Sequence, residues 1–310
     1  MLDIALTTLP FFALVLCGWV AAHTRRLPAG SVGSLNGFVL WFALPAMLFR
    51  FVARTPVEQV LDLRLALGYA GCGLCVYALA VMLLRQRGGS NWIDAAFGSL
   101  AAAWPNWGYM GFGLMPALFG ERALAAMVAA GMMDLLLLVP ISLLVASRQQ
   151  ASGGLDALAT GLKAVARNPL FLAIVSGLAV SLLHLRIPAP VDEFLRLLGS
   201  SAGPVALFAI GVFVHRPGPV RPDGAGVGLI ALKLLVHPAL MWMVGAWLLR
   251  LDPPTLAVVT ATAALPAAGT AFLFVERNGG NVDRVTSAIL LSTVLSFVTI
   301  TTLTAWLHGH

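Results

Sequence analysis

Long hydrophobic stretches separated by short polar segments recur along the whole chain. A helix that crosses the hydrocarbon core of a bilayer needs about 20 mostly apolar residues, and ten stretches come close to that length. They cover residues 3–23, 31–53, 63–84, 92–118, 122–146, 169–186, 194–214, 225–249, 255–276 and 285–307. The pattern therefore predicts an all-α integral membrane protein with ten transmembrane helices.

The longest polar connection, residues 147–168, divides these helices into two halves of five, 1–146 and 169–310. No room is left for a soluble domain. If the N-terminus lies outside, eleven Lys and Arg residues fall in the inner loops and seven on the outer side. The positive-inside rule then places both termini outside the cell membrane and makes 147–168 a cytoplasmic linker. No basic residue precedes the apolar stretch Ile4–Val20, so we expect a retained first helix and not a signal peptide.

The overall composition agrees with a membrane protein. Of 310 residues, 59% are hydrophobic and 10% are charged, whereas soluble domains have about 25% charged residues. The formal charge of +6 is carried by short loops between apolar stretches, which argues against nucleic-acid binding. Cys72 and Cys75 form a CxxC sequence at the end of a Gly-rich segment. We interpret them as small residues facing a neighbouring helix, not as redox or metal ligands, and we expect no metal and no cofactor.

Glycine and proline recur at equivalent positions in the two halves. Gly18, Pro28, Pro45 and Pro105 are followed, 159 to 161 residues later, by Gly177, Pro188, Pro204 and Pro266. Residues 45–49 and 204–208 both read P-x-x-L-F, and residues 102–108 and 263–269 both read A-A-x-P-x-x-G. Because each half has an odd number of helices, the second copy enters from the opposite side and the repeat is inverted. Inverted repeats with interrupted helices at matching places are typical of secondary transporters.

Pro105 and Pro266 each stand in the middle of a predicted span. Proline lacks the N–H of a helix hydrogen bond and clashes with the preceding turn, so we expect both spans to be broken there. Broken backbone at membrane depth is tolerated where it lines a cavity or is buried in protein. The half-helix N-termini at such breaks suit an anion. The alternative is a pair of ordinary proline kinks.

Polar residues next to the breaks are candidates for the substrate site. Asn106 directly follows the first proline, and its amide could donate to a substrate carboxylate or satisfy freed backbone. Tyr109 either lines this site or serves only in helix packing. We also assign Gly269 and Thr270, which follow the second proline, to the substrate site.

Ionisable residues inside predicted spans are candidates for coupling. A charge in a bilayer is costly and usually faces a pathway or a partner. Asp134 is the best candidate for a proton-coupling carboxylate, and its alternative role is as the structural partner of a cation. Lys233 pairs with the substrate or with Asp134, or else extends to the interface. His237 precedes Pro238 and is a candidate proton relay or a cap for kinked backbone.

Motifs of intramembrane enzymes and of ATP-driven transporters are absent from the sequence. It contains no HExxH, no GxGD, no rhomboid-type GxSG and no P-loop. The chain is therefore not expected to be an enzyme. Transport would have to be coupled to a proton, to sodium or to the gradient of the substrate itself.

Several strings resemble the auxin efflux carrier family, which includes bacterial malonate- and malate-type carriers and plant auxin exporters. They are LPAMLF (44–49), PNWGYMG (105–111), NPL (168–170), PVALFAIG (204–211) and LPAAG (265–269) with the later LST (291–293). The resemblance covers nearly the whole chain in the right order. It implies two inverted five-helix repeats with crossing, broken helices 4 and 9, as in bile acid:sodium symporters and sodium/proton antiporters. It also implies scaffold and transport domains, an organic-anion substrate, elevator-type alternating access and a homodimer.

The resemblance makes Pro105 and Pro266 the crossover prolines and Asn106 a substrate-site amide. The family often has a polar amide shortly after the second proline, whereas this chain has Ala267 to Thr270. A symmetric pair of amides around a carboxylate is therefore not expected. We expect a secondary transporter of a small carboxylate. Malonate or malate is favoured over an auxin-like acid as its substrate. The alternatives are a transporter of a neutral or amino-acid solute, and a membrane receptor or sensor on the same fold.

Overall fold

A computed structural model describes residues 2–28, 30–57, 62–87, 89–121, 123–149, 154–215 and 222–308. Within these ranges the regular structure is helical apart from one isolated β-bridge. Six segments are long and apolar enough to cross a membrane, or seven if one bent pair is a single span. The six are Ser31–Arg54, Leu63–Arg87, Ala123–Ala146, Ala189–Phe213, Gly224–Leu248 and Val282–Leu307. The prediction of an all-helical protein with several membrane-spanning helices is confirmed.

The other four predicted spans are shorter or interrupted. Near the N-terminus, α1 (Leu2–His23) has a shorter apolar segment, Leu9–His23. The span predicted for 169–186 is α12 (Pro169–Leu182), which is bent by 63° from the helix before it. The spans predicted for 92–118 and 255–276 are each divided between helices on either side of a proline.

The connection 147–168 contains a helix that the polar pattern did not predict. This helix, α11 (Gly154–Ala166), packs along α10 (Val139–Ala146). A Cβ atom at Gly161 would lie 2.5 Å from the Cα atom of Pro140, so this close approach requires glycine. The bend of 63° between α11 and α12 lies at the two residues that separate them.

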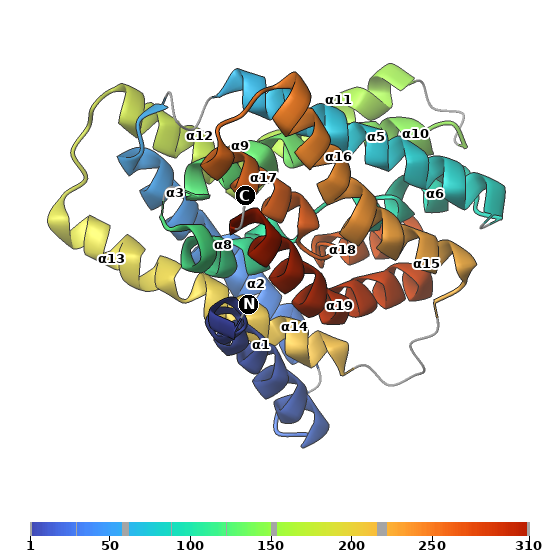
Figure 1. Ribbon diagram of the computed structural model, residues 1–310, viewed down its shortest axis with the longest axis horizontal. Helices are drawn as coiled ribbons and strands as arrows, with labels where there is room; N and C mark the ends of the chain where they lie inside the picture. Colours follow the sequence, from blue (N-terminus) through green and yellow to red (C-terminus); the bar gives the residue numbers. More distant parts are fainter. Residues whose placement is uncertain are drawn as a thin grey trace.

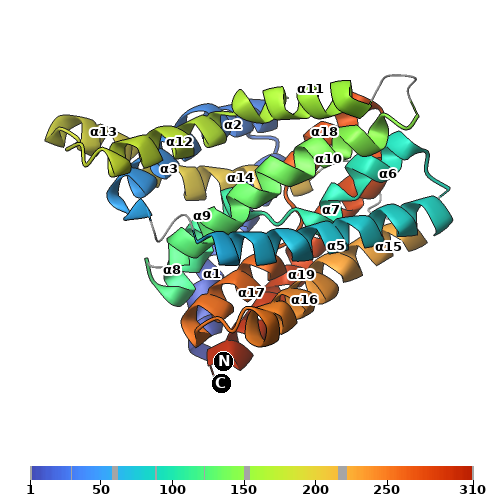
Figure 2. The ribbon, with the colours of Figure 1, turned by 90° about the horizontal axis from the view of Figure 1, so that it is seen from above.

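Apart from α11, which connects α10 to α12, the helices form two groups (Figures 1 and 2). The first helix group consists of α1, α2 (Ser31–Phe38), η1 (Val39–Ala43), α3 (Leu44–Arg54), α12, α13 (Ala189–Ser200) and α14 (Ala202–Val214). In it, α1 packs along α14, and α3 packs against α12 and α13. Gly18 on α1 and Gly211 on α14 each leave no room for a Cβ atom, because the backbone of the facing helix fills that space. The two helices are therefore in direct backbone contact.

The second helix group extends from α8 and α9, near α3, to α6 and α15, which lie on the side away from α12 and α13 (Figures 1 and 2). Its first-half members are α5 (Leu63–Arg87), α6 (Trp92–Gly98), α7 (Leu100–Ala103), η2 (Trp107–Gly111), α8 (Phe112–Phe119), α9 (Ala123–Met133), η3 (Asp134–Leu138) and α10. Its second-half members are α15 (Gly224–Ala231), η4 (Leu232–Val236), α16 (His237–Met243), η5 (Val244–Leu248), α17 (Pro253–Ala264), α18 (Thr270–Asn278) and α19 (Val282–His308). The groups meet where α1 contacts α8 and α19 and where α14 contacts η2.

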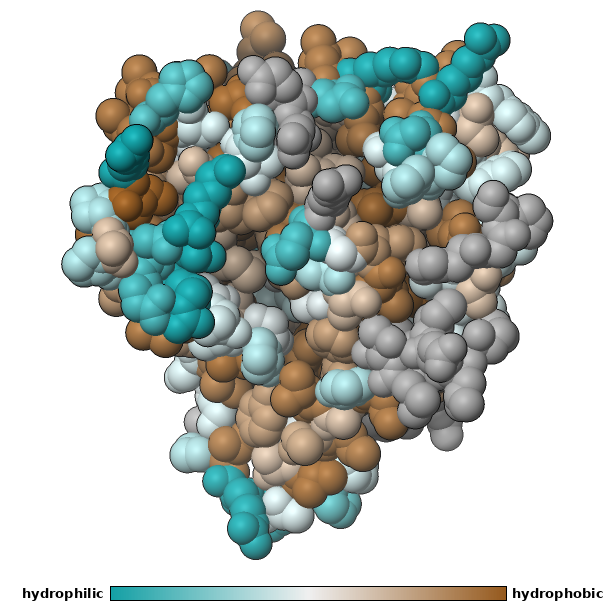
Figure 3. Space-filling view, turned by 60° about the vertical axis from the view of Figure 1, so that its left-hand side comes forward, coloured by the Kyte–Doolittle hydropathy of each residue, from teal (hydrophilic) through white to brown (hydrophobic). Residues whose placement is uncertain are grey.

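Apolar side chains dominate the outside of the molecule. Figure 3 shows one face on which hydrophobic residues cover large areas and strongly polar ones gather in a few separate patches. Large exposed side chains such as Trp41, Phe42 and Trp247 are more than half accessible. Exposed apolar surface on this scale is what a lipid environment requires.

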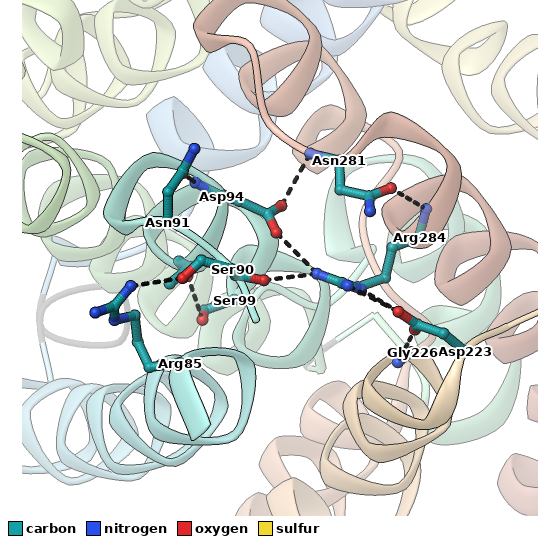
Figure 4. Close-up of polar contacts among 10 residues, drawn as sticks. Arg85, Ser90, Asn91, Asp94, Ser99, Asp223, Gly226, Asn281 and Arg284 are labelled. Atoms are coloured by element: carbon teal, nitrogen blue, oxygen red, sulfur yellow. Dashed lines mark hydrogen bonds and ion pairs between the residues drawn. The ribbon is translucent and has the colours of Figure 1, made fainter. Parts of the chain in front are cut away.

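Arg284 at the start of α19 is the centre of a buried ion network inside the second group (Figure 4). Its guanidinium donates to Asp94 Oδ2 and to Ser90 Oγ at 2.8 and 2.7 Å, and its Nε donates to Asp223 Oδ2 at 2.8 Å. Asp94 also accepts from the backbone N–H of Asn281 at 2.9 Å. The hydrogen bond from Arg284 holds the pKa of Asp223 below its ordinary value. The network joins α6 to the turn between α18 and α19.

Candidate functional site

Two helices of the second group are interrupted at the two prolines that stand in repeated motifs. In the first half, α7 ends at Ala103, the chain is extended at Trp104, and helical structure resumes at Trp107. In the second half, α17 ends at Ala264 and α18 begins at Thr270. Each proline therefore separates two half-helices, because it cannot complete the helical hydrogen bonds around it.

The two interruptions bind to each other. The N–H of Asn106 donates to the carbonyl of Pro266 at 2.8 Å, and the N–H of Ala268 donates to the carbonyl of Trp104 at 2.9 Å. Pro105 and Ala267 thus form an isolated antiparallel bridge. Backbone groups released by one break satisfy those released by the other, as buried backbone away from water must be satisfied. The two segments meet at this bridge, which we call the crossing.

At the first break, a side chain of the same segment stabilises the new helix start. Asn106 is 2% exposed, and its Oδ1 accepts from the N–H of Tyr109 at 3.4 Å. Asn106 is therefore the N-cap of η2. Its NH2 group has no acceptor among the residues that the structure describes. The oxygen satisfies freed backbone, and the nitrogen remains a donor.

At the second break, the stabilising side chains come from other helices. Ser292 on α19 accepts from the N–H of Ala267 at 3.1 Å through its Oγ. Lys233 on η4 donates from Nζ to the carbonyl of Ala263 at 2.8 Å. That carbonyl belongs to the last turn of α17, where a cation is favourable because the helix dipole is negative at its C-terminus.

A pocket of about 420 Å³ lies at the crossing, between the two helix groups. We call it the crossing pocket. Its lining from the first group is Gly30, Val32, Gly33, Asn36, Ala209, Ile210 and Phe213; its lining from the second is Asn106, Tyr109, Gly269, Thr270, Phe272, Leu273, Glu276, Ile289 and Thr293. Four of the predicted substrate residues therefore share one pocket. Pro105 and Pro266 are not in its lining, and they act by shaping the backbone at the crossing.

Comparison with known proteins places the chain in a family. The family model described as "Membrane transport protein" matches residues 4–153 and 156–304. A Rhizobium meliloti (strain 1021) protein named "Putative malonate transporter" is 30% identical over 307 residues, which cover 97% of this chain and 95% of the relative. The chain belongs to this membrane transport family.

Other members of the transporter family extend the similarity. "Uncharacterized transporter YfdV" of Escherichia coli (strain K12) is 26% identical over 302 residues, covering 94% of this chain and 93% of the relative. "Auxin efflux carrier component 8" of Arabidopsis thaliana is 21% identical and covers 94% of both chains. The resemblance to the auxin efflux carrier family is confirmed. The family is one of membrane transporters and not of enzymes.

The ionisable residues predicted inside the spans of this transporter lie outside the crossing pocket. Lys233 is fully buried, so it does not extend to the interface. Its Nζ lies 3.0 Å from His237 Nδ1, so the imidazole of His237 contacts this amine. Asp134 is 3% exposed, and no direct ion pair joins it to Lys233 in the described part of the chain.

Unsatisfied polar atoms surround this buried amine. Asp134 Oδ2, His237 Nε2 and Tyr69 Oη are buried without a hydrogen-bond partner, and the rings of Tyr69 and His237 are 5.9 Å apart. Such atoms are rare in protein interiors and often mark functional positions. Among the described residues, no group of three or more His, Cys, Asp or Glu side chains is placed to hold a metal ion.

Sequence reasoning missed several residues of the transporter's crossing pocket. Glu276 is the last residue of the predicted span 255–276, but Thr270, Leu273 and Glu276 are spaced three apart and all line the pocket. That helical periodicity was a usable signal. Asn36 and Phe213 come from the first group, and no local motif connects them to the breaks.

Proposed function

We propose that this membrane transporter is a secondary transporter that moves a small organic anion, such as malonate, malate or an auxin-like acid, by elevator-type alternating access. The observation that carries the proposal is the crossing pocket, which lies at two mutually bonded helix breaks and between two helix groups. A site at such a boundary is exposed to one side or the other when one group moves.

The chemistry of the crossing pocket supports an anion. The NH2 group of Asn106 is a donor there, and Thr270, the first residue of α18, adds a hydroxyl side chain to the lining. Both half-helices, η2 with α8 and α18, begin at the pocket with the positive ends of their dipoles. Small ligand sites usually combine a few such polar groups with apolar walls, here including Ile210 and Phe213.

The two groups supply the parts that alternating access needs. We infer ten transmembrane helices in two inverted five-helix repeats, with the first helix group as the scaffold and the second as the transport domain. The direct backbone contact between α1 and α14 supports a rigid scaffold. The buried network around Arg284 supports a transport domain that moves as one body. The protein would lie in the cell membrane with both termini outside, and the scaffold would form the interface of a homodimer.

Coupling is assigned to the buried polar cluster behind the crossing. Asp134 would load and release a proton, while Lys233 and His237 would set the charge around it. The ammonium of Lys233 already provides a cation at the C-terminus of α17. A proton is therefore favoured over sodium as the coupling ion.

Uptake of labelled malonate into proteoliposomes tests the proposal. We expect accumulation driven by an imposed pH gradient, and increased thermal stability of the purified protein when carboxylates bind. Stabilisation without any accumulation would identify a receptor or sensor on the same fold. Stabilisation by amino acids or neutral solutes, and not by carboxylates, would identify a different substrate class.

A further inference from the structure

The crossing pocket contains polar side chains but no cationic one. Its polar lining includes Asn36, Asn106, Thr270 and Thr293, and no Lys, Arg or His belongs to the lining that the structure describes. The one carboxylate is that of Glu276, at the C-terminal end of α18, where the side chain is exposed. A negatively charged ligand in this pocket is therefore held without a counter-charge from a side chain.

The positive charge available to an anion comes from the two half-helices. The N-terminus of a helix is equivalent to about half a positive charge. Two of them begin at the pocket, one after Asn106 and one at Thr270, and some of their first N–H groups are already bonded. Together they therefore balance at most about one negative charge. The ammonium of Lys233 is directed elsewhere, since it bonds to Ala263 at the opposite pole of α17.

Glu276 adds a negative charge on the same wall of the pocket. It forms no salt bridge with the cations of the described residues. A second negative charge on a ligand would therefore meet a carboxylate instead of a cation. Like charges placed together disfavour the bound state.

We propose that the crossing pocket takes a ligand with a single negative charge, and that Glu276 contributes to the discrimination against a second charge. The proposal rests on the proposed function, since it concerns the same organic-anion site. A dicarboxylic acid such as malonic acid would enter as its singly protonated monoanion. A monocarboxylate would enter as it is.

Titratable groups on the elements that line or adjoin the pocket could also affect binding as the pH changes. They are Arg25 and Arg26 before α2, His215 after α14, Tyr109 on η2, Asp94 on α6, Glu276 and Arg277 on α18, and Asp283 and Arg284 on α19. Comparing two matched ligands distinguishes the titration of these protein groups from the titration of the ligand itself. Malonate and its monomethyl ester share a skeleton, but the ester has only one ionisable carboxyl group.

The experiment is titration calorimetry of both ligands on the purified full-length protein at several pH values above the second pKa of malonic acid. We expect the dissociation constant of malonate to rise about tenfold per pH unit relative to that of the monoester, as the monoanion becomes scarce. In Glu276→Gln the discrimination against the dianion should shrink by about twofold to fivefold, the size of an exposed charge interaction. Asp283→Asn removes an exposed carboxylate outside the pocket, so it should change the dissociation constant of neither ligand.

Other outcomes separate the two proposals. If malonate binds more tightly than the monoester and the ratio is independent of pH, the pocket takes the dianion and this inference is wrong. If the ratio follows pH but Glu276→Gln behaves as the wild type does, the assignment to Glu276 is wrong. If neither these ligands nor other carboxylates bind at any pH, the organic-anion function itself fails, and this inference fails with it.

Discussion

The two breaks at the crossing are bonded to each other through their backbones but are stabilised in different ways. At the first break, Asn106 bonds to the N–H of Tyr109 within its own segment. At the second, the equivalent positions carry no polar side chain before Thr270, and stabilisation comes from Ser292 and Lys233 on other helices. The polar group that stabilises the first break therefore belongs to the same segment, whereas those that stabilise the second break belong to other helices.

This difference predicts that ligand binding and the stability of the fold depend on different residues. A polar group supplied locally lies at the pocket, as Asn106 does, and can serve both the helix start and a ligand. Groups supplied from other helices, such as Ser292 and Lys233, lie behind the break and are not in the pocket lining. We therefore expect changes at Asn106 to weaken ligand binding and changes at Ser292 to weaken mainly the fold.

The largest expected effect concerns Asp134 of the buried cluster, a residue that lies at neither break. Asp134→Asn imitates the protonated carboxyl, so proton-driven accumulation of labelled malonate should be lost while exchange of labelled for unlabelled substrate survives. Both activities are measured on one proteoliposome preparation. Full proton-driven accumulation by this variant would show that Asp134 does not couple transport. Loss of accumulation and exchange together, with lower stability, would assign it a structural role.

Substitution of Arg284 tests whether the contact between α6 and the turn that follows α18 stabilises the protein. Arg284→Met leaves Asp94 buried without its partner, and we expect a loss of about 3–5 kcal/mol in the free energy of unfolding. Adding Asp94→Asn removes the uncompensated charge and should restore part of this loss. Arg196→Gln is the control, because its ion pair with Glu193 is exposed and should contribute at most about 1 kcal/mol. Equal effects in the two arginine variants would contradict the prediction.

Asn106 tests the first break. Asn106→Ala should weaken malonate binding by about 1–3 kcal/mol, the value of a hydrogen bond to a charged group. Asn106→Asp keeps an oxygen for the N–H of Tyr109 but lacks the NH2 group, so it should lose binding with a smaller change in thermal stability. Calorimetry and thermal unfolding of both variants provide the comparison. If Asn106→Asp binds malonate normally, the amide is only a helix cap.

Ser292 tests the second break. Ser292→Ala leaves the buried N–H of Ala267 without an acceptor, which should lower stability by about 1–3 kcal/mol with little effect on binding. Ser296→Ala is a matched control, since its hydroxyl is equally buried on α19 but bonds only to Thr293 of the same helix. A difference in stability between these variants supports the distinction. Weaker binding in Ser292→Ala than in Asn106→Ala would overturn it.

The sequence predicted both breaks because proline acts locally. It also predicted the substrate role of Asn106, Gly269 and Thr270 as candidates, and these residues do share the crossing pocket. Whether they contact a substrate stays a prediction. The hydrophobic pattern located the membrane-spanning segments because apolar length is a local property as well.

What could not be predicted depends on contacts between distant segments. The bond from Lys233 to Ala263 forms only when η4 and α17 pack together, and the pattern suggested Asp134 as its partner instead. The helix α11 was missed because its stability comes from packing on α10, where Gly161 permits close contact. The first-group lining of the pocket has the same origin, since it depends on how the two groups meet.

The bridge between Pro105 and Ala267 also constrains how the protein is made. The N-terminal half leaves the ribosome first, and at that stage the carbonyl of Trp104 and the N–H of Asn106 have no partners. In hydrocarbon, each such group costs several kcal/mol. Residues 92–119 therefore cannot settle in the bilayer as an independent span, and insertion is completed only when residues 253–278 arrive. The first half of the chain therefore cannot complete its membrane-inserted structure until the second half has entered the membrane.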